Sequence, residues 1–180
     1  MWLFVLLDMS VFAYMFAIFT WQRADHASIF RSSQQAINPW YGLIYTLLLL
    51  SSSWFVVMAI TAARRRRIDL SLKSARWAMV LGSAFVVIKF VEYTTKFVAG
   101  ITPLTNAFFM FYFVMTFLHL LHAATGIGLL AFMRNQIRGL ADAPVADDGD
   151  RLRPIECCAI YWHMVDLLWI FLFALYYLRG

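Results

Sequence analysis

The chain has 180 residues, of which 63% are hydrophobic and 14% are charged, and its formal net charge is +5. A soluble domain is nearer half apolar and a quarter charged, so this composition leaves too little polar surface for a water-soluble globule and excludes that class. The basic residues cluster between long apolar runs, which favours a membrane surface over nucleic acid as their partner.

Five apolar runs are long enough to cross a bilayer, because a spanning helix needs about 20 residues at a rise of about 1.5 Å each. In chain order, we expect helices over residues 2–21, 40–63, 74–99, 104–133 and 155–178. The first run has neither a basic leading segment nor a small-residue cleavage site, so we expect it to be retained as a helix. The sequence therefore predicts an all-α, polytopic membrane protein, with residues 1–180 forming a single transmembrane domain.

Lysine and arginine are concentrated in the second and fourth of the four loops between these runs. Those two loops hold Arg64, Arg65, Arg66, Arg67, Lys73, Arg76, Arg134, Arg138, Arg151 and Arg153, whereas the opposite side holds Arg23, Arg31 and Arg179. The fourth loop also holds Asp142, Asp147, Asp148 and Asp150, but acidic residues count little in the positive-inside rule. The pattern predicts an inner-membrane protein with its N-terminus in the cytoplasm and its C-terminus outside.

Ionisable residues inside the apolar runs are the candidate functional residues, because they are costly in lipid and normally face the bundle interior with a partner. They are Asp8, Lys89, Glu92, His119, His122, Glu156, His163 and Asp166. Lys89 and Glu92 lie three residues apart and so can pair on one helix face. Glu156 lies near the predicted cytoplasmic interface and is expected to be solvated there.

Each candidate has a structural interpretation beside the functional one. Lys89 and Glu92 can be an internal ion pair, and the three histidines at 119, 122 and 163 can form a packed hydrogen-bond network with Asp166. Asp8 has no base near it in the sequence, and desolvation disfavours its charged form unless packing supplies one. For Asp8, a role in proton handling or partner docking stands beside a structural contact.

Metal and haem binding are weakly supported. His119 and His122 form an H-x-x-H pair, but a metal site needs three or four ligands. A b-type haem between this pair and His163 would need small neighbours, and several phenylalanines and Trp162 crowd that region. An independent proton channel or transporter is a further alternative, although no proline lies in the middle of a run, as it often does in transporters. Phosphate-loop, dinucleotide-binding and hydrolase motifs do not occur in the sequence.

Two segments resemble signatures of the cytochrome c oxidase subunit III family of the haem–copper oxidases. Residues 117–126 resemble its G-[FI]-H-x-x-H…G motif, and residues 156–169, ECCAIYWHMVDLLW, resemble its E-x-x-x-x-Y-W-H-F-V-D-x-x-W motif. Glu92-Tyr93 matches a Glu-Tyr pair of the preceding helix. Asp8 falls where the family usually has a carbodiimide-reactive glutamate that is associated with proton uptake.

The resemblance covers nearly the whole chain and corresponds to the last five of the usual seven helices. It implies a non-catalytic accessory subunit, not an enzyme by itself, that stabilises a haem-containing catalytic subunit, binds phospholipid and supports proton uptake. It also implies that the subunit carries no haem or copper. Within the longer motif, Tyr161, Trp162 and Trp169 become candidates for lipid or packing contacts.

Several residues depart from the usual pattern of the family. Lys89 stands where oxidase subunits often have glutamine, and Asp8 replaces glutamate. The segments Lys-x-x-Glu-Tyr, Gly-Ile-Thr-Pro and Thr-Asn-x-Phe-Phe look more like a shorter branch encoded with nitric oxide reductases. We therefore expect that branch, which would place the protein in denitrification, while a terminal oxidase of the respiratory chain remains the other possible partner.

Overall fold

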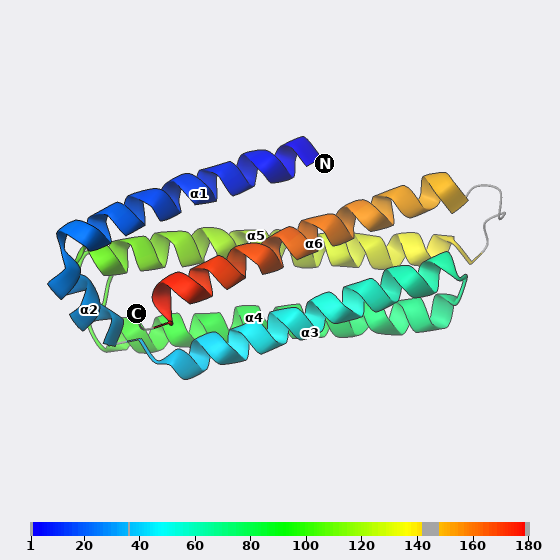
Figure 1. Cartoon of the computed structure of the whole chain (residues 1–180). Coiled ribbons are helices and arrows are strands. Elements are labelled where there is room, and N and C mark those ends of the chain that lie inside the picture. Colours follow the sequence, from blue (N-terminus) through cyan, green and yellow to red (C-terminus); the bar gives the residue numbers. More distant parts are fainter. Residues whose placement is uncertain (1, 36, 142–147, 179–180) are drawn as a thin grey trace.

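A computed structural model describes residues 2–35, 37–141 and 148–178. Within these ranges the chain is entirely helical or loop, as predicted, and Figure 1 shows its long helices side by side in one bundle. The helices are α1 (Trp2–Asp25), α2 (Ala27–Gln35), α3 (Pro39–Arg64), α4 (Ile68–Val98), α5 (Ala107–Gly139) and α6 (Asp148–Tyr176). All except α2 are long and apolar enough to cross a membrane, which confirms the number of predicted spans.

Several helices are longer than the apolar runs that predicted them, and three of these, α4, α5 and α6, extend at the same end of the bundle. α4 begins at Ile68 rather than at residue 74, α5 continues to Gly139 rather than to residue 133, and α6 begins at Asp148 rather than at residue 155. Most of the residues that α4, α5 and α6 add are polar or charged, and they lie at the end of the bundle that carries the basic turn. Backbone hydrogen bonding thus continues past the point where hydropathy falls, because a helix in the headgroup region no longer needs apolar side chains.

The short helix α2 was not predicted, because it is too polar for a search for apolar runs. Phe30, Ser33 and Gln34 form its buried side. Gln34 donates from Nε2 to the carbonyl oxygen of Leu178 at 2.8 Å, and Asn106 donates from Nδ2 to Ser33 Oγ at 2.8 Å. α2 therefore closes one end of the bundle, as Figure 1 shows, and ties it to the start of α5 and the end of α6.

Side-chain caps and one tight turn set where the spans begin and end. Asn38 caps α3 by accepting from the Trp40 amide at 3.0 Å, and Asn106 caps α5 by accepting from the Phe109 amide at 3.0 Å. The turn from α3 to α4 passes through Arg66, whose φ of 55° lies in the left-handed region. A turn this short makes α3 and α4 antiparallel neighbours.

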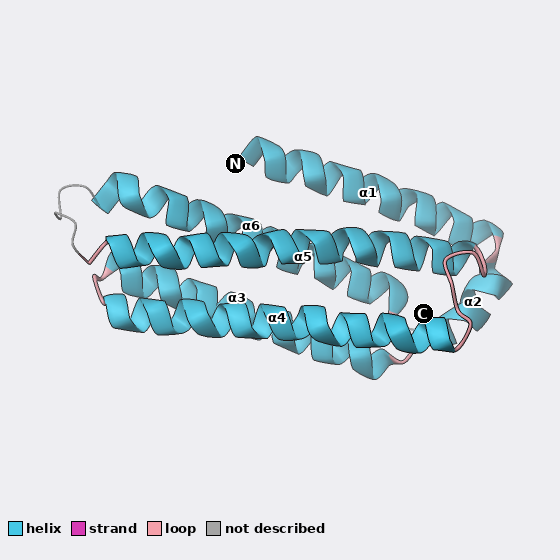
Figure 2. Ribbon diagram, turned by 180° about the vertical axis from the view of Figure 1, so that it is seen from behind, coloured by secondary structure: helices cyan, strands magenta, loops and turns pink. Residues whose placement is uncertain are grey.

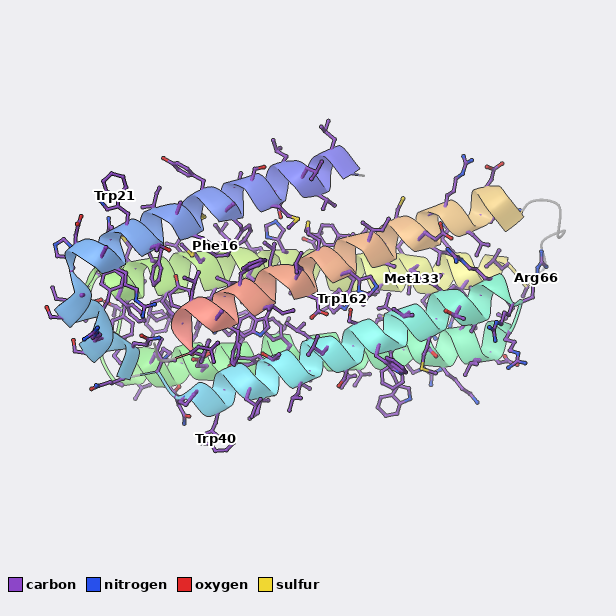
Figure 3. The ribbon with its side chains drawn as sticks, in the orientation of Figure 1. Phe16, Trp21, Trp40, Arg66, Met133 and Trp162 are labelled. Carbon is purple, nitrogen blue, oxygen red and sulfur yellow. The ribbon has the colours of Figure 1, made fainter. Side chains whose placement is uncertain are left out.

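The bundle core is formed by α3, α4, α5 and α6, and α1 runs along the outside of α5 and α6 (Figure 2). Trp162 of α6, labelled in Figure 3, points into this core and is 1% exposed. A Cβ atom placed on Gly82 of α4 or Gly126 of α5 would lie 2.6 or 2.8 Å from its ring. These two glycines therefore make the space that lets one indole join three helices.

The two ends of the bundle differ in charge and in the termini that they carry. α1 runs so that its N-terminal end points toward the α3–α4 turn and the start of α6, although it stops short of them, and the end of α6 lies at the opposite end of the bundle (Figure 1). This arrangement agrees with an odd number of crossings. The direction in the bilayer stays a prediction, and Asp142, Asp147 and Arg179 of the charge argument lie outside the described residues.

Candidate functional site

The first polar cluster surrounds Lys89, whose side chain is completely buried. Its Nζ donates to Glu92 Oε2 at 2.7 Å, to Tyr112 Oη at 3.0 Å and to Tyr177 Oη at 3.2 Å. Lys96 lies 3.5 Å from the other oxygen, Glu92 Oε1. Lys89 and Glu92 thus form the pair that their spacing allows, and Tyr112 of α5 and Tyr177, which follows α6, add further hydrogen bonds.

Aromatic rings enclose the same lysine. Five centroids lie 5.0 to 5.9 Å from Nζ, those of Tyr45, Tyr93, Tyr112, Trp169 and Tyr177. Tyr45 of α3 also donates to Glu92 Oε2 at 3.0 Å, and Tyr112 of α5 donates to Oε1 at 2.8 Å. The cluster therefore satisfies its charges from α3, α4, α5 and the residue that follows α6. Tyr45 and Tyr112 were not predicted as partners, since they lie far from Lys89 in the chain.

The second cluster joins Asp8 of α1 to His122 of α5. His122 Nε2 lies 3.0 Å from Asp8 Oδ1, and His122 Nδ1 lies 2.7 Å from the carbonyl oxygen of Leu118. Because that carbonyl can only accept, Nδ1 carries a hydrogen, and one further proton lies between Nε2 and Oδ1. The two side chains are 20% and 16% exposed. Helix packing thus supplies the base that the sequence around Asp8 lacks.

The third cluster lies between α3 and α6. His163 Nδ1 is 2.6 Å from Ser53 Oγ, and the Ser53 hydroxyl also interacts with the carboxylate of Asp166. Ser53 is 9% exposed and Asp166 is 7% exposed, while His163 is partly exposed. Ser53 was not a predicted site residue, because the three serines at positions 51–53 of an apolar run are a weak signal until a partner is known.

His119 takes part in none of these clusters. It is completely buried between Phe85, at 5.7 Å between ring centroids, and Trp169, at 5.4 Å. Neither ring nitrogen has a hydrogen-bond partner within residues 2–35, 37–141 and 148–178. The single network predicted for the three histidines and Asp166 is therefore wrong. Each histidine turns to a different neighbouring helix, and helical spacing cannot indicate which one.

The remaining predicted residues lie at the basic end of the bundle or in the core. Glu156 accepts from Arg64 Nη2 at 2.7 Å, with side chains 37% and 60% exposed, in line with a solvated position near the interface. Trp169 donates from Nε1 to Thr46 Oγ1 at 3.1 Å. Tyr161 is 4% exposed, and the two tryptophans of the motif are 1% exposed each, so all three aromatic side chains pack against protein.

Among the residues that the structure describes, no three His, Cys, Asp or Glu side chains come close enough together to hold a metal ion. What the described polar groups can do is bind one another and hold protons. Asp8 with His122, and Ser53 with His163 and Asp166, each connect two helices through groups that can exchange a proton.

Comparison with known proteins places this arrangement in a family. The family described as cytochrome c oxidase subunit III matches the chain over residues 1–180. The chain belongs to the cytochrome c oxidase subunit III family. In haem–copper oxidases, subunit III is a non-catalytic subunit that partners the catalytic subunit I and carries no redox cofactor. Together, the family and the apolar helices make this chain an integral membrane protein.

Several relatives show which oxidases carry similar chains. The chain is 27% identical to cytochrome bo(3) ubiquinol oxidase subunit 3 of Buchnera aphidicola subsp. Acyrthosiphon pisum, over 100% of this chain and 85% of the relative. It is also 27% identical to the protein of that name in Pseudomonas aeruginosa, over 99% of this chain and 83% of the relative. The probable quinol oxidase subunit 3 of Staphylococcus haemolyticus is 27% identical over 99% of this chain and 87% of the relative.

These relatives do not support the predicted branch. All three are named as quinol oxidase subunits, and none is named as a partner of a nitric oxide reductase. The chain covers 83% to 87% of the lengths of these quinol oxidase subunits. Nitric oxide reductase and denitrification therefore stay unconfirmed.

Proposed function

We propose that this chain is the accessory subunit III of a quinol-oxidising terminal oxidase of the haem–copper superfamily, in which it stabilises the catalytic subunit. The observation that carries the proposal is the match to quinol oxidase subunits along the whole chain. The bundle offers broad apolar surfaces for that role. On α1, for example, Leu3, Leu6 and Leu7 are 84%, 61% and 67% exposed, which suits contact with lipid or with another membrane subunit.

A supporting role in proton uptake is assigned to Asp8 and His122. The two share a proton between α1 and α5 and remain partly exposed, so the proton can be exchanged with the surroundings. Asp8 stands in the half of α1 nearer the N-terminus, which the positive-inside rule assigns to the cytoplasmic leaflet. Phospholipid covers the exposed apolar faces of the helices in this proposal.

A nitric oxide reductase is the second candidate partner, and the observation that favours it is Lys89. Lys89 stands where oxidase subunits often have glutamine. It is completely buried and forms hydrogen bonds with three partners, so this departure lies in the core of the bundle and not on its surface. An independent proton channel is the third candidate, and it rests on the same buried polar residues.

The test is purification of the tagged chain from its own membranes in a mild detergent, followed by identification of the co-purifying proteins and a visible spectrum. We expect a haem-containing subunit I with quinol oxidase activity in stoichiometric amount. A nitric oxide reductase in its place would select the second candidate. A chain that purifies alone and conducts protons in liposomes would overturn the accessory function, and a Soret band lost in His119→Leu would indicate a cytochrome.

The orientation is tested separately, because it stands apart from the choice of partner. A reporter fused after Gly180 should be active only on the outer side of the membrane, since the basic loops hold the other end inside. Reporter activity in the cytoplasm would reverse the topology. A fusion within the α3–α4 turn, next to Arg66, is the matched control and should behave in the opposite way.

A further inference from the structure

The Ser53–His163–Asp166 cluster lies near the middle of the membrane-spanning part of the chain. Ser53 falls near the centre of α3, which runs from Pro39 to Arg64, and the other two residues fall near the centre of α6. Ionised, Asp166 only accepts hydrogen bonds, so the Ser53 hydroxyl donates to it and accepts from His163 Nδ1–H. Ser53 of α3 then links His163 and Asp166 of α6 through hydrogen bonds.

This chain of hydrogen bonds is incomplete at the histidine. With Nδ1 protonated, Nε2 of the neutral ring is an acceptor. Within residues 2–35, 37–141 and 148–178, Nε2 receives no hydrogen bond, yet it is not among the polar atoms sealed inside the protein. Nor does any described lysine or arginine form an ion pair with Asp166. The cluster thus offers an acceptor to whatever lies outside the bundle.

The surroundings of His163 are apolar and open. Leu167 and Ile170 lie one and two turns further along the same side of α6 and are 40% and 43% exposed. Val57 lies one turn from Ser53 on α3 and is 48% exposed. In Figure 1 α3 and α6 are in front, and no other helix of the chain crosses over their central part.

Lipid is a poor cover for such a surface. Acyl chains carry no hydrogen-bond donors, and water is scarce at this depth, so an imidazole acceptor facing lipid stays unsatisfied. Polar groups in membrane helices are normally paired within the protein or across a helix interface. Among the described residues, the Lys89 cluster meets this rule completely. The Asp8–His122 pair meets it except at Asp8 Oδ2, which is sealed inside the protein and so is closed to an outside partner. The seam between α3 and α6 does not.

We propose that the α3–α6 seam around His163 is the surface on which the catalytic subunit docks, through a transmembrane helix that places a hydrogen-bond donor against His163 Nε2. The apolar residues Val57, Leu167 and Ile170 supply the packing around this contact. The inference rests on the proposed accessory function and adds to it the face, the depth and the chemistry of the contact.

Site-specific photocrosslinking in intact membranes tests the face. A photoreactive phenylalanine analogue replaces Leu167 or Val57 on the seam. Matched controls replace Val87 of α4 or Leu121 of α5, which are 60% and 49% exposed and lie on helices that do not form the seam. We expect crosslinks to the haem-bearing subunit from both seam positions and from neither control. Crosslinks from the controls alone, only to a second copy of this chain, or only to lipid would overturn the proposed surface.

The hydrogen bond is tested in the same complex. His163→Leu should lower the amount of catalytic subunit retained after a detergent wash by about threefold to tenfold, the size of one interhelical hydrogen bond. His163→Gln keeps an acceptor and should retain most of it. Equal retention in the wild type and His163→Leu would overturn the donor contact. Co-purification of the wild-type chain is the separate check, because its failure alone would contradict the accessory function itself.

Discussion

The Lys89 and His163 clusters are both polar groups inside an apolar bundle, but one is closed and the other is open. Around Lys89, hydrogen bonds and rings come from α3, α4, α5, α6 and the residue after α6, and the side chain is 0% exposed. Around His163, the described residues that contribute polar contacts belong to α3 and α6, and the ring remains partly exposed. A closed cluster stabilises the chain itself, whereas an open one gains its last partner only in a complex.

The largest effect is expected from breaking the closed cluster on one side. Lys89→Met leaves Glu92 buried with fewer compensating charges, and loss of one partner of a buried pair costs about 3–5 kcal/mol. The double variant Lys89→Met/Glu92→Leu removes both charges and should recover much of this loss. Thermal unfolding of the purified chain in detergent measures both. A single variant as stable as the wild type would show that the pair contributes little.

A smaller effect that depends on assembly is expected in the open cluster. Asp166→Leu removes the acceptor of Ser53 and should cost about 1–3 kcal/mol, because a buried polar group then lacks its partner. The melting temperature should fall more in the assembled complex than in the chain alone. Normal stability and assembly with abolished turnover would instead give Asp166 a chemical role.

The Asp8–His122 pair is more exposed than the closed Lys89 cluster but has its partner within the chain. Variants of Asp8 can distinguish a role in proton handling from a structural role. Asp8→Asn keeps the shape and a hydrogen-bonding group but cannot exchange a proton, so assembly should be normal while proton uptake slows or the working lifetime shortens. Turnover and proton uptake of complexes in liposomes measure this, after subunit content has been checked. If only Asp8→Leu has an effect, and that effect is on assembly, the pair is structural.

The smallest effect is expected for the exposed pair of Arg64 and Glu156. Their side chains are 60% and 37% exposed, and solvent-exposed pairs contribute only about 0–1 kcal/mol. Glu156→Gln should therefore leave the melting temperature of the chain almost unchanged, with any difference disappearing at high salt. A loss as large as that of Lys89→Met would mean that this end of the bundle is covered in the assembled protein.

The number and type of the membrane spans were readable from the sequence by itself, because a helix in lipid must be apolar over a fixed length. The same holds for the pairing of Lys89 with Glu92, which lie on one helix face. The short helix α2 was missed since its interior-facing side is only three residues, and the polar ends of α4, α5 and α6 were missed because hydropathy does not follow a helix into the headgroup region.

Only the tertiary structure decided which helices exchange polar contacts. Asp8 meets His122 across 114 positions of sequence and His163 meets Ser53 across 110, whereas His119 meets only aromatic rings. Periodicity shows which side chains share a face of one helix, but the partner depends on the order and rotation of helices around the core. Here these are set by packing such as that of Trp162 against Gly82 and Gly126, where two missing side chains admit one indole.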